Sequence, residues 1–201
     1  MDQLSSFTIA VKDDTAANLD GVTVAVVYNV NGTGTVVQYV GGGTALAAGG
    51  DAHTFTVTGV DPSVDSSIYV RGTKSAYTQL TDVAVTLTAG DNGTKTLTLT
   101  RNGTVDLTVT GLAGAQTSTF TFTWTVPILG GSGTATANFT SAITAGSVSI
   151  PANTNVQWTN SAVSGKAFTV NAGGTTDALE TPATNFTVTP GSTSTLVGAF
   201  A

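Results

Sequence analysis

Cysteine and charge are what this sequence most lacks. Cysteine is absent, which excludes disulfide bonds and thiolate chemistry. Only 9% of the 201 residues are charged, against about 25% in a typical soluble domain, and the formal net charge is −6. The six basic residues are scattered. Because nucleic-acid binding begins with a patch that neutralises phosphates, we expect no nucleic-acid partner, and an anionic membrane surface is disfavoured for the same reason.

Long hydrophobic runs are missing too. No run approaches the roughly 18 apolar residues that span a bilayer, so we expect no membrane insertion. The first residues, MDQLSSFTIAVK, contain neither the basic segment nor the apolar stretch of a secretory signal. Thr, Ser, Asn and 24 Gly instead supply a wettable surface, which is common in extracellular and particle-borne assemblies. We therefore expect either a protein assembled in the cytoplasm or one whose leader has been removed.

What the chain does contain is alternation of apolar and polar residues with a period of two, which is typical of half-buried β-strands. Thr and Val dominate these segments, and both favour strands over helices. No window predicts a helix longer than one turn, so the fold class is predicted to be all-β. Strands are expected near residues 5–12, 22–29, 35–40, 52–59, 67–72, 82–88, 94–100, 104–110, 118–126, 133–140, 145–150, 155–159, 167–171, 184–189 and 193–199.

The stretch TLTLTRNGTVDLTVTG, residues 96–111, is either one hairpin or the joint between two domains. A two-residue turn at Asn102-Gly103 would pair Leu99 with Asp106, and every apolar residue would face a polar partner. The pattern therefore excludes the tight hairpin. It leaves a hairpin with the three-residue loop Arg101-Asn102-Gly103, or no pairing at all.

A similarity between the closing segments of the two halves favours two separate domains. The segment VTLTAG at 85–90 closes the first half, and FTVTPG at 186–191 closes the chain. Each is interpreted as a strand, a glycine turn and a last strand, forming a closing hairpin. About seven short strands before each one is the number expected of a small sandwich. We predict two tandem Ig-like antiparallel β-sandwiches, residues 1–101 and 102–201.

The first half also resembles a known group of domains. Residues 5–100 are similar to the carboxypeptidase-regulatory (prealbumin-like) group of Ig-like sandwiches. The likeness is carried by Val11 and Asp13, Leu19-Asp20-Gly21-Val22, the strand containing Tyr69, and Tyr77. GTVDLTVTGLAG and the closing FTVTPG extend it loosely to the second half. The resemblance implies add-on modules of secreted enzymes, surface adhesins or phage virion proteins, without catalysis of their own.

Candidate catalytic and metal-binding groups are few. His53 is the only histidine and hence the only candidate base for a Ser-His-Asp relay, yet no G-x-S-x-G motif accompanies it. Asp61 with Asp65, or Asp13 with Asp14, could contribute to a calcium site, but no D-x-D-x-D-G loop supplies the six to eight oxygens required. We predict no catalytic residue, no cofactor and no metal.

Aromatic residues offer one ligand hypothesis. Phe120, Phe122 and Trp124 alternate along STFTFTWTV, and Trp158 lies in NVQWTN. Such rings could stack on sugars, as in a carbohydrate-binding module, but they are more simply the core of the second sandwich. The threonine ladder from Thr117 to Thr125 resembles an ice-binding surface, but the fixed repeat of such proteins is missing here, so outward-facing threonines of ordinary strands are the preferred interpretation.

The functional prediction is a structural protein. The first hypothesis is a virion protein, a capsid decoration or fibre protein on the virion surface, whose partners are the capsid protein or copies of itself. The alternative is a subunit of an extracellular filament, surface layer or adhesin, and the third is the carbohydrate-binding module. Contacts are expected through strand edges and apolar tips, with the N-terminal strand pairing with a neighbour's edge. The candidate interaction residues are Val126, Pro127, Ile128, Leu129 and Phe7.

Overall fold

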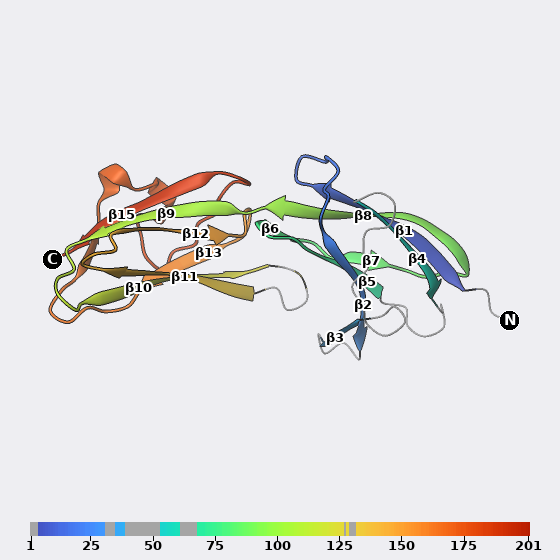
Figure 1. The fold of residues 1–201 in the computed structure, drawn as a ribbon, viewed down its shortest axis with the longest axis horizontal. Helices are drawn as coiled ribbons and strands as arrows, with labels where there is room; N and C mark the ends of the chain where they lie inside the picture. Colours follow the sequence, from blue (N-terminus) through green and yellow to red (C-terminus); the bar gives the residue numbers. More distant parts are fainter. Residues whose placement is uncertain (1–3, 31–34, 39–52, 61–67, 127, 129–131) are drawn as a thin grey trace. The chain divides into compact units, whose positions relative to one another are not determined.

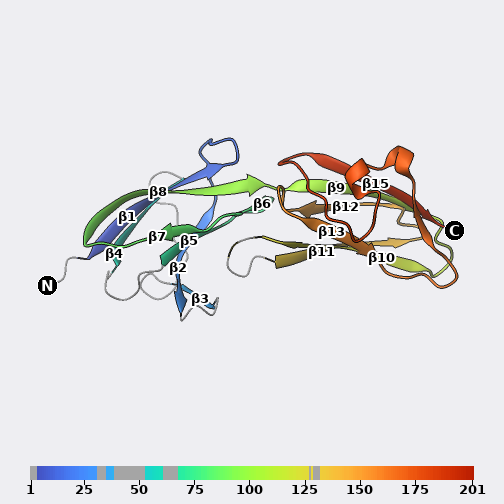
Figure 2. The same cartoon turned by 180° about the vertical axis from the view of Figure 1, so that it is seen from behind.

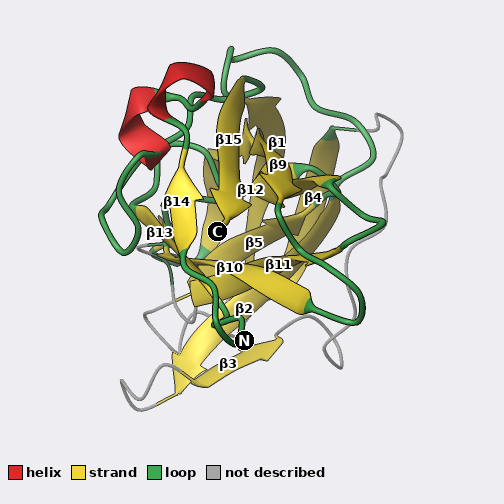
Figure 3. Cartoon of the chain, turned by 90° about the vertical axis from the view of Figure 1, so that its left-hand side faces the viewer, coloured by secondary structure: helices red, strands yellow, loops and turns green. Residues whose placement is uncertain are grey.

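The computed structural model describes residues 4–30, 35–38, 53–60, 68–126, 128 and 132–201. These residues are mostly strand, shown yellow in Figure 3, with two single-turn 3-10 helices, η1 (Ala172–Gly174) and η2 (Asp177–Leu179). The chain divides into two compact units: Met1–Thr100 makes up most of the first, and Arg101–Val126 with Gly131–Ala201 makes up the second. Each unit has two sheets, which confirms the all-β, tandem-sandwich fold class. Within the described part of the chain, no helix is long and apolar enough to cross a membrane.

The first unit is built from eight strands in two sheets of four (Figure 1). The first sheet has the order β4-β1-β8-β6, and the second β3-β2-β5-β7. The bounds are β1 Ser5–Asp13, β2 Thr23–Val30, β3 Thr35–Gln38, β4 Thr54–Val60, β5 Ile68–Thr73, β6 Tyr77–Thr78, β7 Val83–Val85 and β8 Gly90–Arg101.

The second unit has one sheet of three strands, β11-β10-β13, and one of four, β12-β9-β15-β14 (Figure 2). The bounds are β9 Gly103–Thr110, β10 Thr117–Thr125, β11 Ser132–Thr140, β12 Ala145–Ile150, β13 Val156–Asn160, β14 Phe168–Val170 and β15 Thr193–Phe200. Strand β8 pairs with β1, and β9 pairs with β12 and β15, so these two strands belong to different sheets. They form neither the tight hairpin that the register excluded nor the hairpin with a three-residue loop that it left open.

Each unit contains one parallel strand pair, which the prediction of purely antiparallel sheets missed. The first strand of each unit lies beside its last: β1 runs parallel to β8, and β9 parallel to β15. The pairs β1–β4, β2–β3, β2–β5, β5–β7, β9–β12, β10–β11, β10–β13 and β14–β15 are antiparallel. A period-two pattern reports which face of a strand is buried but says nothing about the direction of its neighbour.

The two predicted closing hairpins are wrong. Strand β7 pairs with β5, in the sheet opposite β8. In the second unit the expected strand at 184–189 is only a single bridge, Val156 to Phe186, again in the sheet opposite β15. The turns at Gly90 (φ +93°) and Gly191 (φ +68°) therefore lead the chain from one sheet to the other. The sequence pattern could not distinguish such a crossover from a reversal within one sheet.

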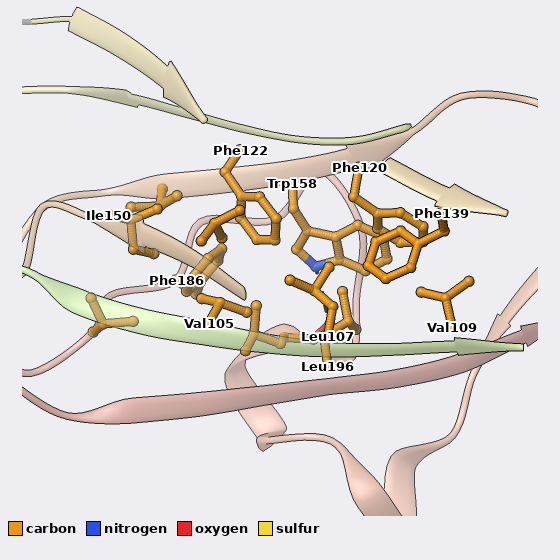
Figure 4. Packing of buried hydrophobic residues seen from close by; sticks show 14 of the residues in the cluster. Val105, Leu107, Val109, Phe120, Phe122, Phe139, Ile150, Trp158, Phe186 and Leu196 are labelled. Atoms are coloured by element: carbon orange, nitrogen blue, oxygen red, sulfur yellow. Dashed lines mark hydrogen bonds between the residues drawn. The ribbon is translucent and has the colours of Figure 1, made fainter. Parts of the chain in front are cut away.

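The core of each unit lies between its sheets, because the apolar residue of each alternating pair points inward. In β1 the odd-numbered residues from Ser5 to Val11 are buried, and the even-numbered residues are half-buried. In the second unit Phe120, Phe122 and Trp158 come from the three-stranded sheet and meet Leu107 and Leu196 of the other (Figure 4). Each aromatic ring buries about 150–250 Å², so this cluster dominates the apolar surface removed from water.

Candidate functional site

Two of the predicted interaction residues, Phe7 and Val126, are buried. Phe7 is 1% exposed and belongs to the core of the first unit. Val126 is 5% exposed, and Ile128 is half-buried. Pro127 and Leu129 lie outside the described residues. Strand β1 already pairs with β4 on one side and β8 on the other, so it has no free edge to offer a neighbour.

His53 is held by a polar network in the first unit. A carboxylate can only accept, so His53 Nδ1–H donates to Asp20 Oδ1 at 2.9 Å. The other ring nitrogen, Nε2, accepts from Asn18 Nδ2 at 2.8 Å. Lys12 Nζ donates to Asn18 Oδ1, and Lys74 Nζ donates to the backbone oxygen of Asp20.

This arrangement resembles half of a hydrolytic relay but lacks its reactive end. In such a relay the second imidazole nitrogen faces a hydroxyl or thiol nucleophile. Here an Asn18 amide takes that place, and it also connects His53 to β1 through Lys12. The network therefore serves to fasten the loop before β2 to the start of β4.

The Asp13 carboxylate is used inside its own turn. Its Oδ1 accepts from Thr15 N at 2.8 Å, Thr15 Oγ1 at 2.7 Å and Ala17 N at 3.0 Å. The side-chain hydrogen bond from Thr15 is the main cause that lowers the pKa of Asp13 from its ordinary value of 3.8. Among the described residues no group of three or more acidic or His side chains could hold a metal ion, and Asp61 and Asp65 lie outside them.

The two tryptophans have different environments. Trp158 is fully buried, its Nε1 donates to Leu179 O at 3.1 Å, and its ring stacks on Phe120 with centroids 5.8 Å apart. Trp158 therefore belongs to the core and cannot be a sugar platform. Trp124 is half-buried at the end of the inward row that begins with Phe120. A Cβ on Gly133 would lie 2.8 Å from the indole, so the ring covers this glycine of β11.

The outer face of the three-stranded sheet is entirely uncharged. Residues of β10 and β11 face one another there in register, Thr121 opposite Thr136 and Thr123 opposite Thr134. On the other side of β10, Thr123 is opposite Gln157 of β13. The outward residues of the three strands are Thr117, Thr119, Thr121, Thr123, Thr125, Ser132, Thr134, Thr136, Asn138, Thr140, Gln157 and Thr159. The threonine ladder predicted on one strand is therefore continued on its neighbour.

A depression lies on this face over β10 and β13. Its volume is about 330 Å³, and it is lined by Thr123, Trp124, Thr125, Asn155, Gln157 and Asn185. Thr123, Thr125 and Gln157 point outward, whereas Trp124 points to the opposite face because successive side chains of a strand alternate. Gln157 Nε2 donates to Asn185 Oδ1 at 3.0 Å, which joins the two amides. We call this site the amide depression.

Among the strands that the structure describes, β11 is at the edge of its sheet, with β10 on one side only. It pairs with β10 over nine consecutive residues, Ser132 to Thr140, without a register shift. Its sequence, SGTATANFT, contains no charge and no proline. Proteins usually protect an edge with charge, proline, a bulge or brevity, and β11 has none of these protections. Sequence reasoning named strand edges in general but could not tell which strand would be outermost.

Comparisons with known proteins assign no family. No family model matches the chain, and no curated protein matches it. Three pilins are among the solved structures that match. A streptococcal ancillary pilin has 15% identity and a TM-score of 0.47, with coverage of 97% of this chain and 62% of that one. The chain thus spans less than two thirds of that pilin's length.

Two further matches cover nearly the whole of both chains. A major pilin protein of Streptococcus pyogenes has 12% identity and a TM-score of 0.40, with coverage of 98% of this chain and 96% of that one. A shaft pilin of Lactobacillus rhamnosus GG has 10% identity and a TM-score of 0.32, with coverage of 99% of both chains.

Proposed function

We propose that the chain is a non-enzymatic structural subunit that assembles with copies of itself into an extracellular filament or surface layer. The observation that carries this proposal is the unprotected edge of β11. An exposed edge presents a row of backbone N–H and C=O groups that can pair with a strand of another molecule. The uncharged side chains of β11 place no repulsive charge in the way of a second strand.

The complementary edge is assigned to β4 of the next copy. Within the described part of the chain, β4 is the outermost strand of its sheet, and its sequence, TFTVTGV, is also uncharged. The pairing of β4 with β1 shifts in register between Ser5 and Phe7, near the C-terminal end of β4. Thr54–Val57 is therefore the part of β4 that pairs regularly. Pairing β11 with β4 of a neighbour uses two different surfaces, so each added subunit leaves one edge open. Contacts of this kind support open-ended growth.

The test is light scattering of the purified chain over a concentration series. The edge variant is Thr134→Lys with Thr136→Lys, at two exposed positions of β11. The matched control is Thr108→Lys with Thr110→Lys, at two exposed positions of β9, which is a central strand. We expect growth of the wild type and the control, and loss of growth in the edge variant, because lysine on an edge opposes strand addition.

Two results would contradict the proposal. One is a wild-type chain that keeps a constant small size at every concentration, and the other is an edge variant that grows as the wild type does. The capsid decoration protein, the first function predicted from the sequence, requires a particle for binding. It remains a prediction, which a constant small size would favour.

A further inference from the structure

The amide depression has the chemistry of a binding site that the assembly proposal does not use. Gln157 belongs to β13, and Asn155 directly precedes this strand. The free edge of β11 is on the other side of β10. All three amide side chains, Asn155, Gln157 and Asn185, are on exposed residues. The depression is therefore accessible from solvent while β11 pairs with another strand.

The lining is suited to a ligand that carries many hydroxyl groups. Amides and threonine hydroxyls both donate and accept, as sugar hydroxyls do. The bond from Gln157 to Asn185 uses one N–H and one acceptor site. Gln157 Oε1 can accept and the Asn185 NH₂ group can donate, so the pair offers both kinds of partner that sugar hydroxyls need.

The uncharged strands around the amide depression favour a neutral ligand. None of the strands β10, β11 and β13 carries a charged residue. In the second half of the sequence the charged residues are only Arg101, Asp106, Lys166, Asp177 and Glu180. An anionic or cationic ligand would lose its hydration here without an opposite charge in return, whereas a neutral polyol exchanges one set of hydrogen bonds for another.

The size and shape favour a short stretch of a longer chain. A volume of about 330 Å³ lies at the low end of the roughly 300–1,000 Å³ typical of small-molecule sites. The threonine rows of β10 continue from the depression along the same face, so the site is not closed at that end. The structure assigns the amide depression as a binding site for a neutral polysaccharide, gripped through hydrogen bonds and not through an aromatic platform.

The test uses nuclear magnetic resonance of the full chain, at concentrations below those at which scattering detects growth. The probes are six-unit neutral gluco- and manno-oligosaccharides, with an oligogalacturonate as the anionic comparison. We expect a neutral probe to shift the side-chain NH₂ signals of Asn155, Gln157 and Asn185. The double variant Gln157→Ala with Asn185→Ala should weaken binding about tenfold or more, because two hydrogen-bonding groups are lost.

The matched control is Thr108→Ala with Thr110→Ala, which removes two exposed hydroxyls from the other sheet of the same unit. It should bind as the wild type does. Four results would overturn the inference: no shift with any neutral probe at millimolar concentration, binding only of the anionic probe, equal weakening in both variants, or shifts that follow protein concentration instead of sugar. The last would identify the face as a contact between copies. None of these results depends on whether β11 drives assembly.

Discussion

Trp158 and Leu179 are joined by a buried hydrogen bond, from the indole Nε1 to the backbone oxygen over 3.1 Å. Both residues are fully buried. Leu179 ends η2, a single turn without side-chain caps, so this bond fixes an irregular segment against the regular β13. An aromatic residue that seemed available for a ligand is thus part of the internal framework of the second unit.

Trp158→Phe should lower the free energy of unfolding by about 2–4 kcal/mol, because it leaves the Leu179 oxygen unpaired and removes part of a packed ring. Urea unfolding followed by circular dichroism measures this loss. Trp124→Phe is the control, since its ring is only half-buried, and it should cost clearly less. Equal losses would contradict the assignment of the two environments.

Gly111→Ala should destabilise the second unit by about 3 kcal/mol or more. Its φ is +84°, and an added Cβ would lie 2.0 Å from the backbone oxygen of Phe200, so conformational strain adds to a clash with backbone. Gly114→Ala is the matched control, since φ is +55° there and no atom lies within 4 Å. It should cost only about 1–2 kcal/mol, and thermal unfolding of both variants distinguishes the clash from the strain.

In the first unit the Gln79 side chain makes hydrogen bonds to backbone groups, as a neighbouring strand would. It is 4% exposed, accepts from Gly72 N at 3.0 Å, and donates to Val70 O at 3.0 Å and Thr81 O at 2.9 Å. Gln79→Leu keeps similar volume but leaves these groups unpaired, and should cost more than about 2 kcal/mol. Hydrogen exchange of the Gly72 amide should accelerate with it. An unchanged exchange rate would show that other partners replace the side chain.

Acid should weaken the first unit through Asp13. Its folded pKa is lowered, so its stabilising contribution is complete above the unfolded value and is lost as pH falls through the folded value. The loss therefore lies below the ordinary value of 3.8. Asp13→Asn keeps an acceptor but does not titrate. The difference in urea midpoint between wild type and variant should shrink from about pH 5 to about pH 2, and a constant difference would contradict this.

Deleting residues 1–8 should unfold or strongly destabilise the first unit, because β1 is a central strand of this unit and not a strand free to pair with a neighbour. The deletion removes Phe7 and half of that strand, and the loss of the ring alone costs about 3–5 kcal/mol. Urea unfolding of the full chain and of the deletion variant measures this loss, and an equally stable variant would show that this part of β1 is dispensable.

Much of this fold could be predicted because local alternation determines which side chains are buried. The buried positions of β1 and the row of Phe120 and Phe122 follow directly from period two. Trp124 and Trp158 share the same pattern, so their different burial could not be read from it. The partner of the Trp158 indole, Leu179, lies in η2, a segment without periodicity, so the pattern gave no sign of this contact.

The candidate sites were harder to predict because the residues that form each of them are distant in the sequence. Gln157 meets Asn185 across 28 positions, and His53 meets Asp20 across 33. The free edge of β11 depends on the order of strands in a sheet, which is decided by long-range pairing. Residue type suggested polar surfaces, but only the tertiary arrangement shows which amides are neighbours.

The parallel pairing of first and last strands determines how each unit would respond to tension. In the first unit Ser5 lies beside Gly90 and Asp13 beside Leu99, so the two strands point the same way. A pull on the start of β1 and the end of β8 would slide these strands along one another. The hydrogen bonds of the ladder would then carry the force together instead of opening one by one. The pair β9 and β15 repeats this geometry, so each unit by itself is built to resist stretching.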